Sequence, residues 1–239
     1  MIQFPLGIFS NALSQAILPT FSQQVITDQT DKLRHTLSFG LRAVFFVILP
    51  AEVFFMVLAK PLVTALFAGG KFDVYSARLT ANALFFYSIG LSAYGANKIL
   101  QSCFFSLKDT VTPTKISALG LILNVVLNSI LMFPLKIGGI ALATSVSGII
   151  TFCVLFALLK KKIGDFGFRE IIFSFLRILA ASICMGAVCY FSAHLSANRF
   201  LNLAVVLALG FISYIIFCFI FRVSEMRQLW GWVRYRKAY

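Results

Sequence analysis

The feature that most constrains this chain is a succession of apolar runs, each long enough to cross a lipid bilayer. A transmembrane helix needs about 20 mostly apolar residues, and it satisfies its own backbone hydrogen bonds where no water is available. The runs are continuous rather than alternating, which predicts an all-α integral membrane protein. We expect one partial N-terminal span and six full transmembrane helices, at residues 4–18, 36–59, 79–105, 114–132, 138–159, 171–194 and 201–221.

The composition agrees with a membrane protein and argues against a soluble one. Of the 239 residues, 60% are hydrophobic and 12% are charged, whereas a soluble domain carries roughly 25% charged residues. The net charge of +13 could indicate a nucleic-acid partner, but Lys and Arg gather in the short loops between apolar runs. We therefore expect no nucleic-acid binding.

The distribution of Lys and Arg predicts the orientation, because cytoplasmic loops of membrane proteins are enriched in these residues. One side of the predicted topology carries Lys32, Arg34, Lys108, Lys115, Lys160, Lys161, Lys162, Arg169, Arg222, Arg227, Arg234, Arg236 and Lys237. The opposite side carries only Lys60, Lys71, Arg78, Lys136 and Arg199. The first side is predicted to be cytoplasmic, so the first residue faces outward and the C-terminus is cytoplasmic.

The C-terminal tail, residues 222–239, mixes basic residues with Trp and Tyr. Aromatic rings suit the headgroup region, and basic side chains are attracted to anionic lipids. The tail is thus expected to contact membrane lipids, with a protein contact as the alternative.

A polar stretch from Lys98 to Lys115 separates two of the apolar runs and must lie in water at one membrane face. Asp109, Thr110 and Thr112 are each able to accept hydrogen bonds from the free N–H groups that begin the next helix. Pro113 suits the first turn, where its missing N–H costs nothing. The stretch therefore predicts a capped turn between two membrane helices.

Polar side chains inside the run 79–105 mark a possible substrate cavity. Tyr87, Tyr94, Lys98 and Gln101 are spaced by 7, 4 and 3 residues, which places them on one helix face. Polar residues within a span usually face protein or a water-filled cavity. The alternatives are helix packing for this face and, for Lys98, a long side chain that extends to the headgroups.

Three further polar residues within spans are candidates with two interpretations each. Asn124, one turn before Asn128, either lines the cavity or packs helices together. Arg42 either lines the cavity or extends to the headgroups. Glu52 follows Pro50, which can kink the helix. It is either a structural carboxylate or a proton-coupling group.

No constellation for covalent chemistry is present. The sequence has no nucleophile elbow, no phosphate-cradling glycine loop before a helix and no paired carboxylates within one segment. The five cysteines lack metal-binding spacings, and the two histidines lack acidic or thiol partners at ligand spacing. We expect no catalytic residue, no metal and no cofactor, and hence not an enzyme.

Several segments together carry a family resemblance. They are FPLGIFSNALSQAILPTFS (4–22), GLR (40–42) leading to LP (49–50), KPLVTALFAGGKFD (60–73), FFSLKDTVTPTK (104–115), LNVVLNSILMFPLKIGGIALATS (123–145) and LLKKKIG (158–164). On these the chain resembles the C-terminal half of MurJ/MviN-type lipid II flippases, members of the multidrug/oligosaccharidyl-lipid/polysaccharide exporter superfamily. The resemblance runs through the whole chain and is strongest up to about residue 165.

The resemblance implies fourteen membrane helices, arranged as two six-helix lobes around a cationic cavity, plus a C-terminal helix pair. Residues 1–165 would form one lobe, incomplete at its N-terminus; residues 166–221 would form the peripheral pair and 222–239 the cytoplasmic tail. It also implies a place in the bacterial inner membrane. The family's cavity arginines lie outside this sequence, so we expect a fragment, a split protein or a truncated gene product.

The implied activity is translocation of lipid II, the undecaprenyl-linked peptidoglycan precursor, by alternating access. The missing N-terminal half of the transporter would be the partner of this chain in that activity. Lys98 and Asp109 match the family pattern, whereas Glu52 stands where the family has a small or apolar residue and inherits no family role. Two alternatives are an exporter of another lipid-linked oligosaccharide or drug, and a non-transporting membrane scaffold.

Overall fold

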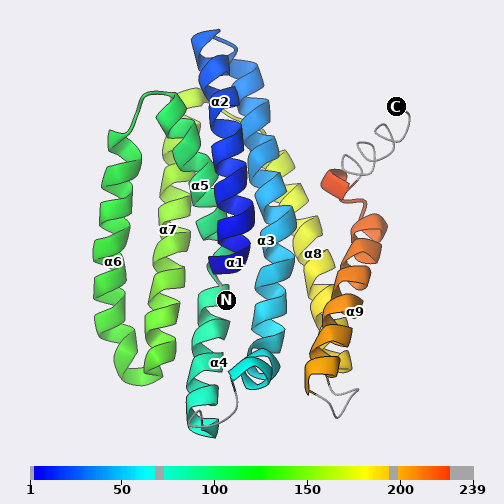
Figure 1. Ribbon diagram of the computed structural model, residues 1–239. Coiled ribbons are helices and arrows are strands. Elements are labelled where there is room, and N and C mark those ends of the chain that lie inside the picture. The colour runs from blue at the N-terminus through cyan, green and yellow to red at the C-terminus, as the bar shows by residue number, and fades with distance from the viewer. Residues whose placement is uncertain (1–2, 68–72, 194–198, 227–239) are drawn as a thin grey trace.

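The computed structural model describes residues 3–67, 73–193 and 199–226, and every regular element within those ranges is a helix (Figure 1). In chain order the helices are α1 (Gln3–Pro5), the π-helix η1 (Leu6–Asn11), α2 (Ala12–Ile26), α3 (Thr30–Phe67), α4 (Val74–Ser88), α5 (Leu91–Ser106), α6 (Val111–Leu135), α7 (Ile137–Ile163), α8 (Phe168–Ser192) and α9 (Arg199–Ile220). The all-α prediction is confirmed for the described residues.

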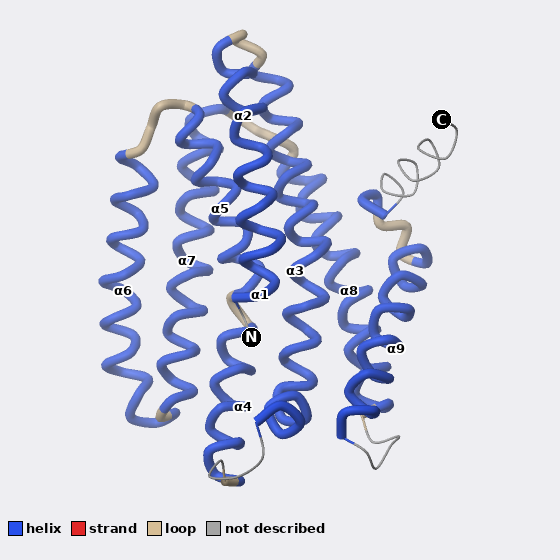
Figure 2. Tube along the Cα trace, viewed as in Figure 1, coloured by secondary structure: helices blue, strands red, loops and turns tan. Residues whose placement is uncertain are grey.

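The long helices run side by side, with α6 at one edge of the bundle and α9 at the other (Figures 1 and 2). Helix α8 packs between α3 and α9, α6 packs on α7, and α4 and α5 fill the space between α3 and α7. The buried core lies mainly between α3, α5, α7 and α8. In α6 only Pro113 is buried, so this edge helix presents most of its apolar surface outward.

Five described helices are long and apolar enough to cross a membrane: α3, α6, α7, α8 and the Leu201–Ile220 part of α9. The predicted span 79–105 is not a single helix, because α4 ends at Ser88 and α5 begins at Leu91. The single-helix prediction for this segment was therefore wrong. The exact number of membrane crossings stays a prediction.

The break between α4 and α5 results from a close approach of α7. A Cβ atom on Gly90 would lie 2.7 Å from the Cα atom of Ser145, so only glycine fits here. The Ser145 hydroxyl donates to the carbonyl of Phe86 at 2.7 Å and lies 3.2 Å from that of Tyr87. A side chain from α7 thus satisfies carbonyls that the ending helix leaves without partners.

Helix α3 bends near its end rather than at its middle. Pro50 lies within regular helix, whereas Leu58 has non-helical angles (φ −104°, ψ 16°). Pro61, three residues later, has no N–H to donate, and its ring crowds the carbonyl four residues before it. The final turns of α3 therefore lie across the direction of the bundle (Figure 1).

The turn between α5 and α6 is capped by one carboxylate. Asp109 accepts from the backbone N–H of Thr112 at 3.0 Å and from its hydroxyl at 2.8 Å, and Lys162 on α7 also donates to it. Pro113 lies in the first turn of α6, as expected. Thr112 donates where we expected it to accept, and the Thr110 side chain makes no cap bond. The capped turn is confirmed, with Asp109 as its cap.

Candidate functional site

An open cavity of about 590 Å³ lies where the start of the chain, the end of α3, α4, α5 and α7 meet. Its volume falls within the range that small-molecule sites occupy. Apolar residues form most of its wall, and its polar lining residues are Gln3, Thr80, Tyr87, Tyr94 and Thr144. Hydroxyl and amide groups on an apolar wall are able to bind a polar ligand without covalent chemistry.

The break between α4 and α5 positions the two tyrosines of this cavity. Tyr87 lies in the last turn of α4 and Tyr94 in the first turn of α5. The Tyr94 hydroxyl donates to the carbonyl of Thr144 at 2.8 Å, which fixes its ring against α7. The sequence predicted both tyrosines on one face of one helix. The structure brings them to one cavity across a helix break, a feature that transporters use at substrate sites.

The two other residues of the predicted polar face lie beyond this cavity. Lys98 is exposed and follows Tyr94 by one turn of α5, whereas Gln101 is half-buried. Neither lines the cavity. Residues three or four apart share a helix face, so Lys98 extends the Tyr94 side of α5 toward the predicted cytoplasmic end.

Asn124 lies behind the cavity wall rather than on it. Its amide donates to the hydroxyls of Thr144 at 3.1 Å and Ser147 at 3.3 Å, and it accepts from the Asn128 amide at 2.9 Å. These bonds join α6 to α7, which corresponds to the helix-packing interpretation of Asn124. Thr144, which lines the cavity, was missed as a site residue because the small residues Ala141 and Gly148 share its helix face, a pattern typical of helix packing.

Arg42 is buried against the end of the peripheral helix pair. Its Nε atom lies 3.5 Å from the Glu225 carboxylate, and both side chains are buried. Arg42 does not line the cavity. Neither interpretation from the sequence anticipated this ion pair, because Glu225 follows α9 and only tertiary packing brings the two together. The pair holds the chain after α9 against α3.

Glu52 caps a helix that begins inside the bundle. Its Oε2 atom accepts from the backbone N–H of Ser92 at 2.9 Å, in the first turn of α5. That N–H has no partner within its own helix, and the positive end of a helix dipole favours a carboxylate. Glu52 thus has a structural partner; proton coupling stays a prediction.

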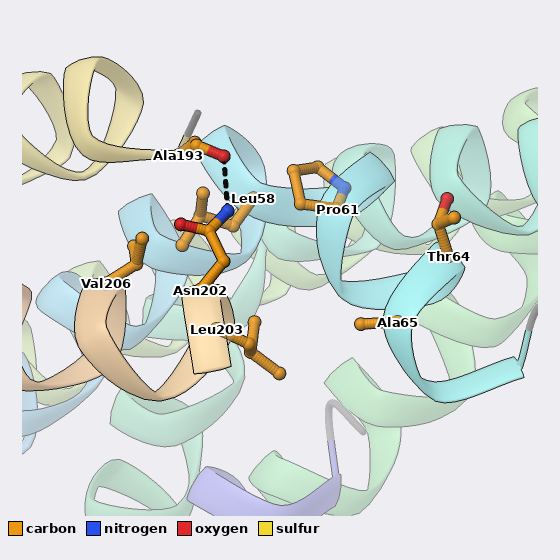
Figure 3. A pocket seen from close by; sticks show the side chains of 8 residues that line it. All are labelled: Leu58, Pro61, Thr64, Ala65, Ala193, Asn202, Leu203 and Val206. Atoms are coloured by element: carbon orange, nitrogen blue, oxygen red, sulfur yellow. Dashed lines mark hydrogen bonds between the residues drawn. The ribbon is translucent and has the colours of Figure 1, made fainter. Parts of the chain in front are cut away.

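A smaller pocket of about 130 Å³ lies beside the bend of α3 (Figure 3). Leu58 and Pro61 form one side, and Asn202 and Val206 of α9 form the other. The Asn202 amide donates to the Ala193 carbonyl at 2.5 Å and so joins the two ends of the α8–α9 connection. The pocket is smaller than typical ligand sites, so we assign it to packing around the bend.

The thiols and acidic groups are dispersed through the described part of the chain. All five cysteines are free: three are buried, Cys184 is half-buried and Cys153 is exposed. Within the described ranges, no three His, Cys, Asp or Glu side chains lie close enough together to hold a metal ion. The groups available at the cavity are hydroxyls and amides, which bind by hydrogen bonding.

Comparison with known proteins identifies relatives of the whole bundle. A family model described as lipid II flippase MurJ matches residues 1–227. The probable lipid II flippase MurJ of Vibrio cholerae is 30% identical over 223 residues, which cover 90% of this chain and 42% of the relative. The corresponding Buchnera aphidicola (subsp. Acyrthosiphon pisum) protein is 30% identical over 235 residues, 96% of this chain and 46% of the relative.

A solved structure titled "Lipid II flippase MurJ, inward closed conformation" superimposes with a TM-score of 0.76 at 26% identity. The superposition covers 91% of this chain and 44% of that one. The chain therefore spans less than half the length of these relatives, and its fold matches that part of theirs.

Proposed function

Because the chain belongs to the lipid II flippase MurJ family, we propose that it forms the C-terminal half of a flippase that moves lipid II across the bacterial inner membrane. The chain is a multi-pass membrane protein, and the relatives are named for transport of a peptidoglycan precursor. Such transport breaks no covalent bond.

The observation that carries this proposal is the open cavity at the helix break. The cavity opens to the outside of this chain, and Tyr87 and Tyr94 contribute hydroxyl groups to its wall. In the proposed transporter, an N-terminal lobe faces this opening, and the two lobes rock so that the cavity opens to each side in turn. The chain's coverage of less than half of its relatives supports a second lobe.

We assign the polar groups to the headgroup of the substrate. The hydroxyl groups of Tyr87, Tyr94 and Thr144 suit the sugars, and the exposed cation of Lys98, with Gln101 one turn further, suits the pyrophosphate. The lipid tail would remain on the apolar exterior. Arg42 and Asn124 are assigned a structural role in the lobe. Arg42 acts through its ion pair with Glu225, and Asn124 acts through its hydrogen bonds to α7.

The proposed division of the chain follows the family resemblance, and α8 also packs into the same buried core as α3, α5 and α7. Residues 1–165 are assigned to the lobe, and α8 and α9 to a pair beside α3. In the predicted lipid-contacting tail 222–239, Glu225 packs against Arg42, and residues 227–239 lie outside the described residues. The excess of Lys and Arg at one end of the bundle supports a cytoplasmic C-terminus.

The proposal is tested by joining the N-terminal half of the V. cholerae relative to this chain and measuring lipid II translocation in liposomes. We expect the joined protein to flip lipid II and the isolated chain not to. A chimera that is folded and monodisperse but moves no lipid II would contradict the proposal. Movement of another lipid-linked oligosaccharide instead would favour the exporter alternative.

A further inference from the structure

A second crevice, of about 470 Å³, lies between α3, α5, α7 and α8. It shares no lining residue with the cavity at the helix break. Its wall is almost entirely apolar, and five phenylalanines dominate it: Phe45, Phe152, Phe156, Phe168 and Phe175. The acidic group on this wall is Glu52.

The Glu52 carboxylate is hydrogen-bonded to Ser92, and within the described part of the chain it has no counter-charge. Its residue is 9% exposed, and its Oε2 atom accepts from the backbone N–H of Ser92. Among the described residues, no Lys, Arg or His lies within 4.0 Å of this carboxylate, although the other buried acid, Glu225, has Arg42. An isolated carboxylate in apolar surroundings is either protonated or paired with a positive charge, so a cation that enters the crevice would stabilise the ionised form of Glu52.

Four of the five phenylalanine rings favour the same kind of ligand; the face of the fifth, Phe168, already lies 4.6 Å from the Lys160 ammonium. Phe45 packs edge-to-face against Phe175 (centroids 5.1 Å apart) and against Phe152 (6.2 Å). A cation near the face of an aromatic ring is attracted by the ring's quadrupole, and more strongly where water is excluded. Apolar substituents on the cation would replace lipid contacts on the remaining wall.

The crevice opens between α7 and α8 on the outer surface of the bundle. Residues on this side are exposed: Phe168 (43%), Ile172 (39%) and Cys153. Both helices are long and apolar enough to span a membrane, so their outer surface is covered by lipid. A ligand would enter from the bilayer, which selects for lipophilic molecules.

We propose that this crevice is a binding site for lipophilic organic cations, such as aryl-substituted amines or phosphonium ions, with Glu52 as the counter-charge. The alternative occupant, an acyl chain of a bilayer lipid, would fit the apolar wall but would offer no charge to Glu52, which would then be protonated or rely on Ser92 alone. The site is independent of the proposed lipid II cavity.

The direct test measures binding of tetraphenylphosphonium to the purified full chain in detergent by equilibrium dialysis. Glu52→Gln keeps an oxygen that can accept from Ser92 but removes the charge, and we expect it to weaken binding about tenfold or more. Glu170→Gln is the matched control, because Glu170 is an exposed acid in the first turn of α8. It should bind as the unmodified chain does.

A second variant keeps the proposal testable if Glu52→Gln does not fold. Phe175→Leu keeps an apolar wall but removes a ring, and we expect binding to weaken severalfold. Bound tetraphenylphosphonium should also slow maleimide modification of Cys153, which lines the crevice and is exposed.

Three results would overturn the proposal. The first is equal tetraphenylphosphonium binding by the unmodified chain and Glu52→Gln, and the second is no binding to the unmodified chain. The third is equally tight, Glu52-independent binding of the neutral triphenylphosphine oxide, which would identify an apolar site for lipid chains.

Discussion

At the scale of single residues, Asp109 shows how one carboxylate secures a turn at the membrane surface. The hydrogen bond from Lys162, followed by those from Thr112, lowers the pKa of Asp109 from 3.8 to about 2. A carboxyl whose pKa is lower in the folded state stabilises the fold above its unfolded pKa. This contribution is present above about pH 4 and is lost as the pH falls through about 2.

We predict that Asp109→Ala lowers the free energy of unfolding by about 1 kcal/mol at pH 7, since it removes the cap of α6. The exposed ion pair adds little to this. Circular dichroism during thermal unfolding in detergent measures the loss. The difference between the variant and the unmodified chain should shrink as the pH falls from 4 to 2.

Asp165→Ala is the matched control for this prediction. Its carboxylate lies 3.5 Å from Lys160 and 3.5 Å from the Phe168 N–H, which are longer contacts than those of Asp109. We expect a smaller loss. A loss for Asp109→Ala that does not change with pH would show that the charge of Asp109 is not what stabilises the turn.

At the scale of elements, the lengths of the apolar runs predicted α6, α7, α8 and α9 well but not the break between α4 and α5. A lone glycine in an apolar run gives no local signal of a helix end. The break depends on Ser145 from α7 and Glu52 from α3, which only the folded bundle brings to it. Likewise, the bend in α3 occurs near Pro61 and not at Pro50, although the two prolines look alike in sequence.

We predict that Gly90→Ala destabilises the chain by about 1–3 kcal/mol, because the new Cβ would lie 2.7 Å from the backbone of α7. Thermal unfolding in detergent measures the change. Gly7→Ala is the control, since a Cβ there meets nothing within 4 Å. Equal stability of both variants would mean that α4 and α5 are free to move away from α7, and that the close approach does not define the break.

At the scale of the whole molecule, the chain is a bundle with an open cavity whose mostly apolar wall carries several polar groups. The sequence predicted Tyr87 and Tyr94 as cavity residues because helical spacing is a local property. It could not predict that Thr144 lines the same cavity, or that Arg42 pairs with Glu225, because both depend on helices distant in sequence. The polar pattern therefore named two residues that line this cavity, and packing brings in the others; that the cavity binds substrate stays a prediction.

Lys98 provides the test of how far the substrate site extends along α5. In the V. cholerae chimera, we predict that Lys98→Ala reduces lipid II translocation in liposomes about tenfold, because one charge-assisted contact to the pyrophosphate is lost. Lys98→Arg should retain most of the activity. Lys115→Ala, which removes an exposed cation from the first turns of α6, should leave translocation unchanged. If Lys98→Ala instead flips lipid II normally at normal expression, the side chain extends to the headgroups, and the substrate site ends at Tyr94.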